Sequence, residues 1–155
     1  MDFLLWATRS MHVFGVIVWC GGLLYQSIIT RDDDATGPGT TAYRFILLFQ
    51  PYVWMSVWTI LITGVALMLF SPRYVFLRFE DAWSVLLGLK QVTFVLMVVC
   101  AFGHARMMSR VEELLARGTG DEKIQPYYRQ MLRLGKTNVI LALLAVVLAA
   151  GMSRP

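Results

Sequence analysis

Four apolar stretches alternate with polar connectors along the chain, at about residues 4–29, 43–70, 82–108 and 134–152. Each stretch is long enough to cross a hydrocarbon core about 30 Å thick as a helix. Their interiors hold almost no charge, whereas the helices of a soluble bundle need a charged outer face. The pattern therefore predicts an all-α protein: one domain, residues 1–155, folded as an integral membrane bundle of four transmembrane helices.

Composition supports the same interpretation, with 57% hydrophobic and 15% charged residues and a mean hydropathy of +0.61. Arg9 interrupts the start of the first apolar stretch, which lacks the basic region and Ala-x-Ala cleavage site of a signal peptide. We expect that helix to belong to the mature protein. Cys20 and Cys100 fall inside predicted spans, where a free cysteine acts as a small apolar side chain, so the sequence indicates no disulfide framework.

Charge distribution predicts the orientation in the membrane. Four crossings place both termini on one side, with the connectors after the first and third helices on the other. Those two connectors and the adjoining helix ends carry nine Lys and Arg residues, against four on the side of the termini. Since basic residues favour the cytoplasmic side, we expect both termini outside. Orientation and lipid contact explain the net charge of +4 without nucleic acid as a partner.

The first helix presents a conspicuous polar and small-residue face. At 3.6 residues per turn, one face collects five residues that are poorly suited to lipid: His12, Gly15, Trp19, Gly22 and Gln26. We expect this face to turn toward other helices or a ligand. The two glycines suggest room there for a flat ring.

Lys90 is the most unusual residue of the third helix, because a charged side chain inside a membrane span is costly and marks a candidate functional site. The alternative is that its stem lets the ammonium reach the outer surface. Depth along the helices places Lys90 near the level of His12, with Arg9 one turn before the histidine. Arg9, His12 and Lys90 suit a planar, metal-binding ligand with two carboxylates, such as a porphyrin, with His12 as the iron ligand.

His104 lies 14 residues after Lys90, about 21 Å along the helix at 1.5 Å per residue. This separation argues against one haem clamped between His12 and His104. His104 ends the predicted span, so we expect an interfacial residue at the level of Gln26 and Asn138, with a second haem as the alternative.

Several motifs resemble the bacterial four-helix membrane proteins that include HemJ-type protoporphyrinogen IX oxidase. They are His12 with the following Val-Trp-x-Gly-Gly-Leu-Leu-Tyr, Pro51 in the second helix, Lys90 and His104 in the third, and Arg133 to Asn138 opening the fourth. The first helix is also similar to that of CopD-type copper-export domains. The Tyr-Leu-Pro-Arg stretch expected after the first helix is replaced by Tyr25 to Thr30, and Asn-Glu-Val-Pro in the fourth is reduced to Asn138 and Val139.

The HemJ-type resemblance implies a haem b/porphyrin-binding redox protein of the bacterial inner membrane, an oxidoreductase that passes electrons from a porphyrin to a quinone. It assigns iron binding to His12 and a catalytic part to Lys90. The candidate cofactor-binding residues are Arg9, His12, Trp19, Lys90 and His104.

Two alternatives stay open. One is an accessory transmembrane subunit of a respiratory or photosynthetic complex, surrounded by lipid and partner helices or by further copies of itself. The other is copper transport through soft ligands, drawn from Met11, His12, Met97 and Cys100, although the sequence has no Met-x-x-Met or Cys-x-x-Cys pair.

Overall fold

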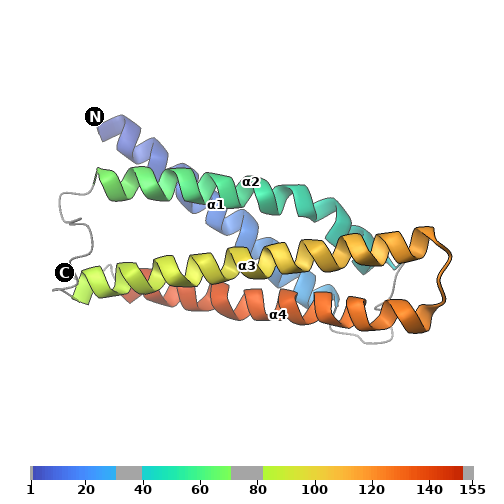
Figure 1. Ribbon diagram of the computed structural model, residues 1–155. Coiled ribbons are helices and arrows are strands. Elements are labelled where there is room, and N and C mark those ends of the chain that lie inside the picture. Colours follow the sequence, from blue (N-terminus) through green and yellow to red (C-terminus); the bar gives the residue numbers. More distant parts are fainter. Residues whose placement is uncertain (1, 31–39, 71–81, 152–155) are drawn as a thin grey trace.

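The computed structural model describes residues 2–30, 40–70 and 82–151, and consists of four long helices (Figure 1). They are α1 (Asp2–Ile29), α2 (Thr41–Leu69), α3 (Ala82–Ala116) and α4 (Asp121–Gly151). Each is long and apolar enough to cross a membrane, and large apolar side chains are exposed on all four. The chain is therefore a multi-pass membrane protein with an all-α bundle, as the sequence predicts. Arg31, Arg73, Arg78 and Arg154, which contributed to the predicted orientation, lie outside the described residues.

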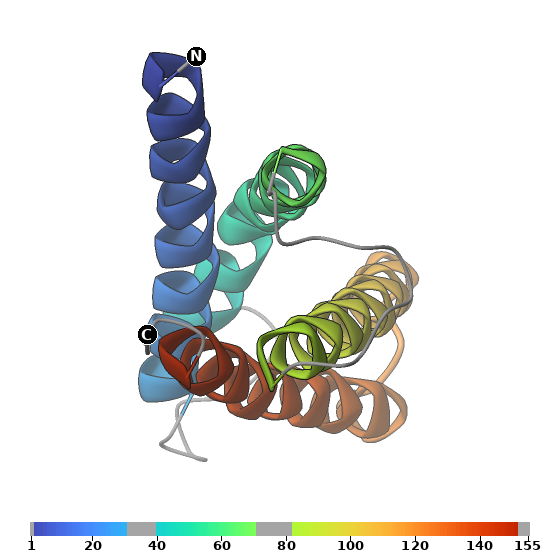
Figure 2. The ribbon, with the colours of Figure 1, turned by 90° about the vertical axis from the view of Figure 1, so that its left-hand side faces the viewer.

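The helices form two antiparallel hairpins. α3 packs along α4 and α1 packs along α2, whereas α2 meets α3 at few points. Figures 1 and 2 show α1 inclined to α3 and α4, so that its first turns stand away from the end of α4. Phe3, Leu4 and Trp6 in those turns are exposed accordingly.

Local sequence explains how α2 begins and bends. Thr40 is the N-cap, and its side chain accepts a hydrogen bond from the backbone N–H of Tyr43 at 3.3 Å, which satisfies one of the free donors of the first turn. Pro51 lies inside the helix and removes one backbone donor. The helix continues through it, and Figure 1 shows α2 bent in its first half.

Two apolar clusters hold the bundle. The first lies in the middle of the predicted spans and contains Trp19, Val57, Met97 and Ala142, one from each helix. The second, which includes Tyr43, Val111 and Tyr128, joins the start of α2 to the end of α3 and the start of α4. This second cluster extends the bundle beyond the apolar stretches.

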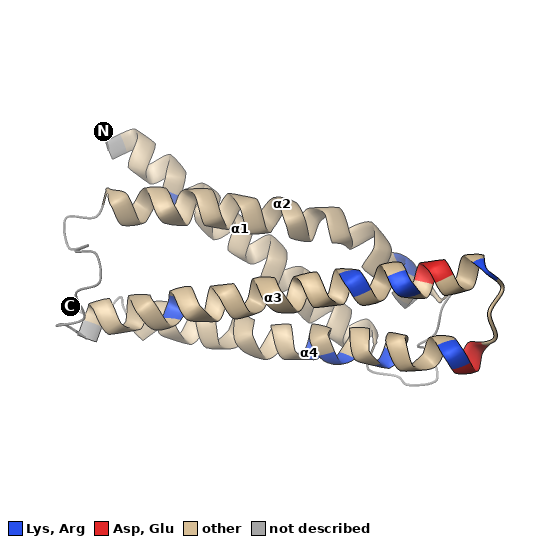
Figure 3. Ribbon diagram, in the orientation of Figure 1, with Lys and Arg blue, Asp and Glu red and all other residues tan. Residues whose placement is uncertain are grey.

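The third and fourth helices are longer than predicted. The segment 109–133, between the third and fourth predicted spans, is helical apart from a break at residues 117–120. Its two halves, however, continue α3 and α4 without interruption. The charged residues gather at that end (Figure 3), including the ion pairs of Glu113 with Arg110 and Arg117.

Candidate functional site

His12 lies on α1 against α2, half-buried between the two helices. Its Nδ1 is 2.9 Å from the hydroxyl of Thr63. A β-carbon at Gly64 would lie 3.3 Å from Cε1 and 3.7 Å from Nδ1 of His12, with Nε2 farther away. The absent side chain of Gly64 therefore leaves room for the imidazole, whose Cε1 is the ring atom nearest to that position.

The Thr63 hydroxyl determines which ring nitrogen of His12 carries the proton. That hydroxyl donates its hydrogen to the backbone carbonyl of Thr59, so its oxygen accepts toward His12 and Nδ1 is the donor. Nε2 of the neutral ring then keeps its lone pair. A histidine that ligates a metal is usually oriented in this way, through a hydrogen bond donated by its other nitrogen.

Lys90 and Arg9 occupy different environments. Lys90 is half-buried on α3 and forms no hydrogen bond or ion pair with any other described residue. Its ammonium is close enough to the His12 imidazole for the two groups to interact electrostatically. This interaction agrees with the predicted common depth of His12 and Lys90, which stays a prediction. Arg9 is exposed, one turn before His12, and its role in binding a carboxylate stays a prediction.

The small-residue face of α1 was expected to turn toward other helices or a ligand, and it packs against α2. A β-carbon at Gly15 would lie 3.1 Å from Ile60, and one at Gly22 would overlap the ring of Phe49. The expectation that these glycines leave room for a flat ring is wrong, because side chains of α2 fill the space. Trp19, on the same face, is 1% exposed and packs edge-on against Phe94 of α3.

His104 is buried in the bundle, 8% exposed, and α3 continues for twelve residues beyond it. The burial shows that His104 faces the other helices, and its expected position at the membrane interface stays a prediction. The expected level is confirmed, since Nε2 of Gln26 lies 3.2 Å from Nε2 of His104. An amide nitrogen can only donate, so Nε2 of His104 accepts this bond and its lone pair is engaged.

A small cavity adjoins this pair, and we call its polar lining the central polar cluster. It comprises Trp19 and Gln26 of α1, Gln50 of α2, His104 of α3 and Asn138 of α4. The cavity measures about 20 Å³, enough for one water molecule and not for a macrocycle. Sequence reasoning placed Gln26, His104 and Asn138 at one level but overlooked Gln50, whose amide inside an apolar run was the available signal.

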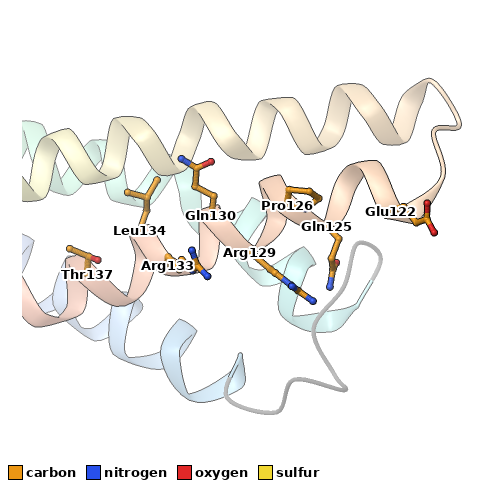
Figure 4. A pocket seen from close by; sticks show the side chains of 8 residues that line it. All are labelled: Glu122, Gln125, Pro126, Arg129, Gln130, Arg133, Leu134 and Thr137. Atoms are coloured by element: carbon orange, nitrogen blue, oxygen red, sulfur yellow. The ribbon is translucent and has the colours of Figure 1, made fainter.

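The remaining candidates are scattered or open to the surface. In the part of the chain that the structure describes, no three His, Cys, Asp or Glu side chains gather to hold a metal ion. Of the proposed copper ligands, Met97 is buried with Trp19 in the core and Met11 is exposed. A hollow of about 790 Å³ lies along the start of α4 (Figure 4) and is lined by Glu122, Gln125, Arg129, Gln130 and Arg133, among others.

Three comparisons with known proteins place no established relative beside this chain. No model of a protein family, no curated protein and no solved structure matches it.

Proposed function

We propose that the protein is a membrane redox protein that binds a b-type haem through Nε2 of His12. The observation that carries this proposal is the orientation of His12. Its Nδ1 lies 2.9 Å from the Thr63 hydroxyl, which itself donates to the Thr59 carbonyl, so Nε2 of the neutral ring keeps its lone pair. Neutral imidazole is a common axial ligand of haem iron, and a fixed tautomer in a membrane span favours that use. The imidazole of His12 is therefore a suitable ligand for haem iron.

Lys90 supports the same assignment. Burying an ammonium in a membrane span without a carboxylate partner is costly, and Lys90 has no such partner among the described residues. A ligand that carries carboxylates or develops negative charge would offset this cost. Lys90 and, at the outer surface, Arg9 are the basic groups nearest His12 along the helices, and they would pair with such groups of a porphyrin.

We infer the class of reaction from Arg9, His12 and Lys90 together with the HemJ-type resemblance. The bound haem would supply one-electron redox chemistry. The chain would orient the iron ligand through Thr63 and position an anionic porphyrin substrate through Lys90. We propose porphyrinogen oxidation, with a quinone as the electron acceptor, as the activity.

The two histidines of the chain provide a matched test. His12→Ala and His104→Gln would each be purified in mild detergent, with helicity and elution volume as controls for folding, and then titrated with haem. We expect the b-type spectrum to be lost in His12→Ala and kept in His104→Gln, because Nε2 of His12 keeps its lone pair whereas Nε2 of His104 accepts a hydrogen bond from Gln26. A folded His12→Ala protein that keeps the full haem spectrum would contradict the proposal.

A further inference from the structure

The central polar cluster contains three buried polar atoms that form no hydrogen bond with any residue in the described part of the chain: Nε1 of Trp19, Nε2 of Gln50 and Oδ1 of Asn138. Trp19 is 1% exposed and Asn138 is 3% exposed. Leaving such groups unpaired is costly, so buried polar atoms are almost always bonded to protein or to ordered water. These three atoms belong to three different helices, and all three residues line the same cavity.

The chemistry of the three atoms is complementary to a single small molecule. Trp19 and Gln50 each present an N–H donor, and Asn138 presents a carbonyl acceptor. Water has two lone pairs and two hydrogens, so it can accept from both donors and donate to the carbonyl. Buried waters typically make about three such bonds, and a cavity of 10–15 Å³ or more suffices for one. The cavity here measures about 20 Å³, which restricts the ligand to the size of water.

We propose that the protein binds one ordered water molecule in the centre of the bundle, bridging Trp19, Gln50 and Asn138. The Gln26–His104 hydrogen bond beside it joins α1 to α3. Together the water and this bond connect all four helices at one level. The water and this bond therefore add polar links between two hairpins that the first apolar cluster already joins. Unpaired polar groups find no solvent in hydrocarbon, which makes such a bridge persistent.

The direct test is a structure of the wild-type protein in detergent or nanodiscs, at a resolution where ordered waters are visible. We expect one water peak within about 3.2 Å of Nε1 of Trp19 and Oδ1 of Asn138. The proposal is overturned if the cavity shows no peak, or if side chains have turned so that protein groups satisfy these atoms.

A double-mutant cycle gives an independent test, because Trp19 and Asn138 form no direct hydrogen bond with each other. Trp19→Phe and Asn138→Leu each remove one hydrogen-bond partner of the water. Each should raise the unfolding equilibrium constant about 10-fold. If a water bridges the two residues, the double variant should raise the unfolding equilibrium constant by much less than 100-fold, which is the product of the two single effects. Strictly multiplicative effects would overturn the proposal. The wild-type structure decides the question if a variant does not fold.

Discussion

Gly22 and Gly21 are adjacent glycines with opposite surroundings. A β-carbon at Gly22 would overlap the ring of Phe49, whereas one at Gly21 would meet nothing within 4 Å. Phe49 cannot swing aside freely, because its ring stacks between Phe45 and Tyr52 with centroid distances of 5.5 and 6.2 Å. Close approach of α1 and α2 therefore depends on one glycine of the pair.

The prediction at this scale compares Gly22→Ala with Gly21→Ala. Gly22→Ala should lower the free energy of unfolding by about 1–3 kcal/mol, the usual cost of overpacking. Gly21→Ala should leave it unchanged or raise it by up to about 1 kcal/mol through helix propensity. Thermal unfolding in detergent, followed by circular dichroism, measures both. Equal effects of the two substitutions would show that α1 and α2 do not pack as described.

The periodicity of the sequence predicts which residues of a helix point inward, but it does not predict which side chains of the neighbouring helix they meet. The spacing of Gly15, Trp19 and Gly22 correctly identified an inward face, but not that Ile60 and Phe49 fill the space beside the glycines. On α2, the hydroxyls of Thr59 and Thr63 donate to carbonyls of their own helix. That Thr63 also orients His12 depends on a contact between helices that sequence spacing does not contain.

The α3–α4 turn is the element whose sequence most directly dictates its structure. The N–H of Gly118 bonds to the carbonyl of Leu115 at 3.0 Å, and that of Thr119 bonds to Leu114 at 3.1 Å. These two bonds form a Schellman motif, which places its C′ residue in the left-handed region. Gly118 has a φ of 65° there. The break at Gly118–Gly120 was predictable for this reason, whereas the continuous helices on both sides depend on the second apolar cluster.

At the element scale we predict that Gly118→Ala destabilises the hairpin and Gly120→Ala does not. A side chain in the left-handed region costs about 1–2 kcal/mol, and Gly118 requires that region. Gly120 lacks a positive φ and has open space around it. Urea or detergent unfolding of the two variants would measure the difference. A Gly118→Ala variant as stable as Gly120→Ala would contradict the Schellman geometry.

For the whole molecule, four long helices put the start of α1 and the end of α4 at the same end of the bundle (Figure 1). The charged turn between α3 and α4 lies at the opposite end (Figure 3). At 1.5 Å per residue the 35 residues of α3 span about 52 Å, well beyond a hydrocarbon core of about 30 Å. We therefore expect the charged end of the hairpin to project from the membrane, and the positive-inside rule predicts that it faces the cytoplasm.

Cysteine labelling in intact cells tests this orientation. In a background without Cys20 and Cys100, Phe3→Cys and Glu122→Cys would each provide one exposed thiol at opposite ends of the bundle. A membrane-impermeant maleimide should label Phe3→Cys in intact cells and Glu122→Cys only after permeabilisation. The reverse pattern would place the termini inside.

The number of helices was predictable from sequence, because span length follows from counting residues. The pairing into two hairpins, with few contacts between α2 and α3, was not predicted. It depends on which small residues allow close approach: Gly22 between α1 and α2, and Gly103 between α3 and α4, where a β-carbon would lie 3.1 Å from Leu134.

A reduced-minus-oxidised absorption spectrum would show whether the protein binds haem. The wild-type protein would be purified in mild detergent from cells supplied with a haem precursor. Pyridine haemochrome quantitation would give the stoichiometry. The proposed role of His12 predicts a b-type spectrum with close to one haem per chain. Absence of haem from folded protein would contradict it, and would instead favour an accessory subunit or, with bound copper, a copper-transport role.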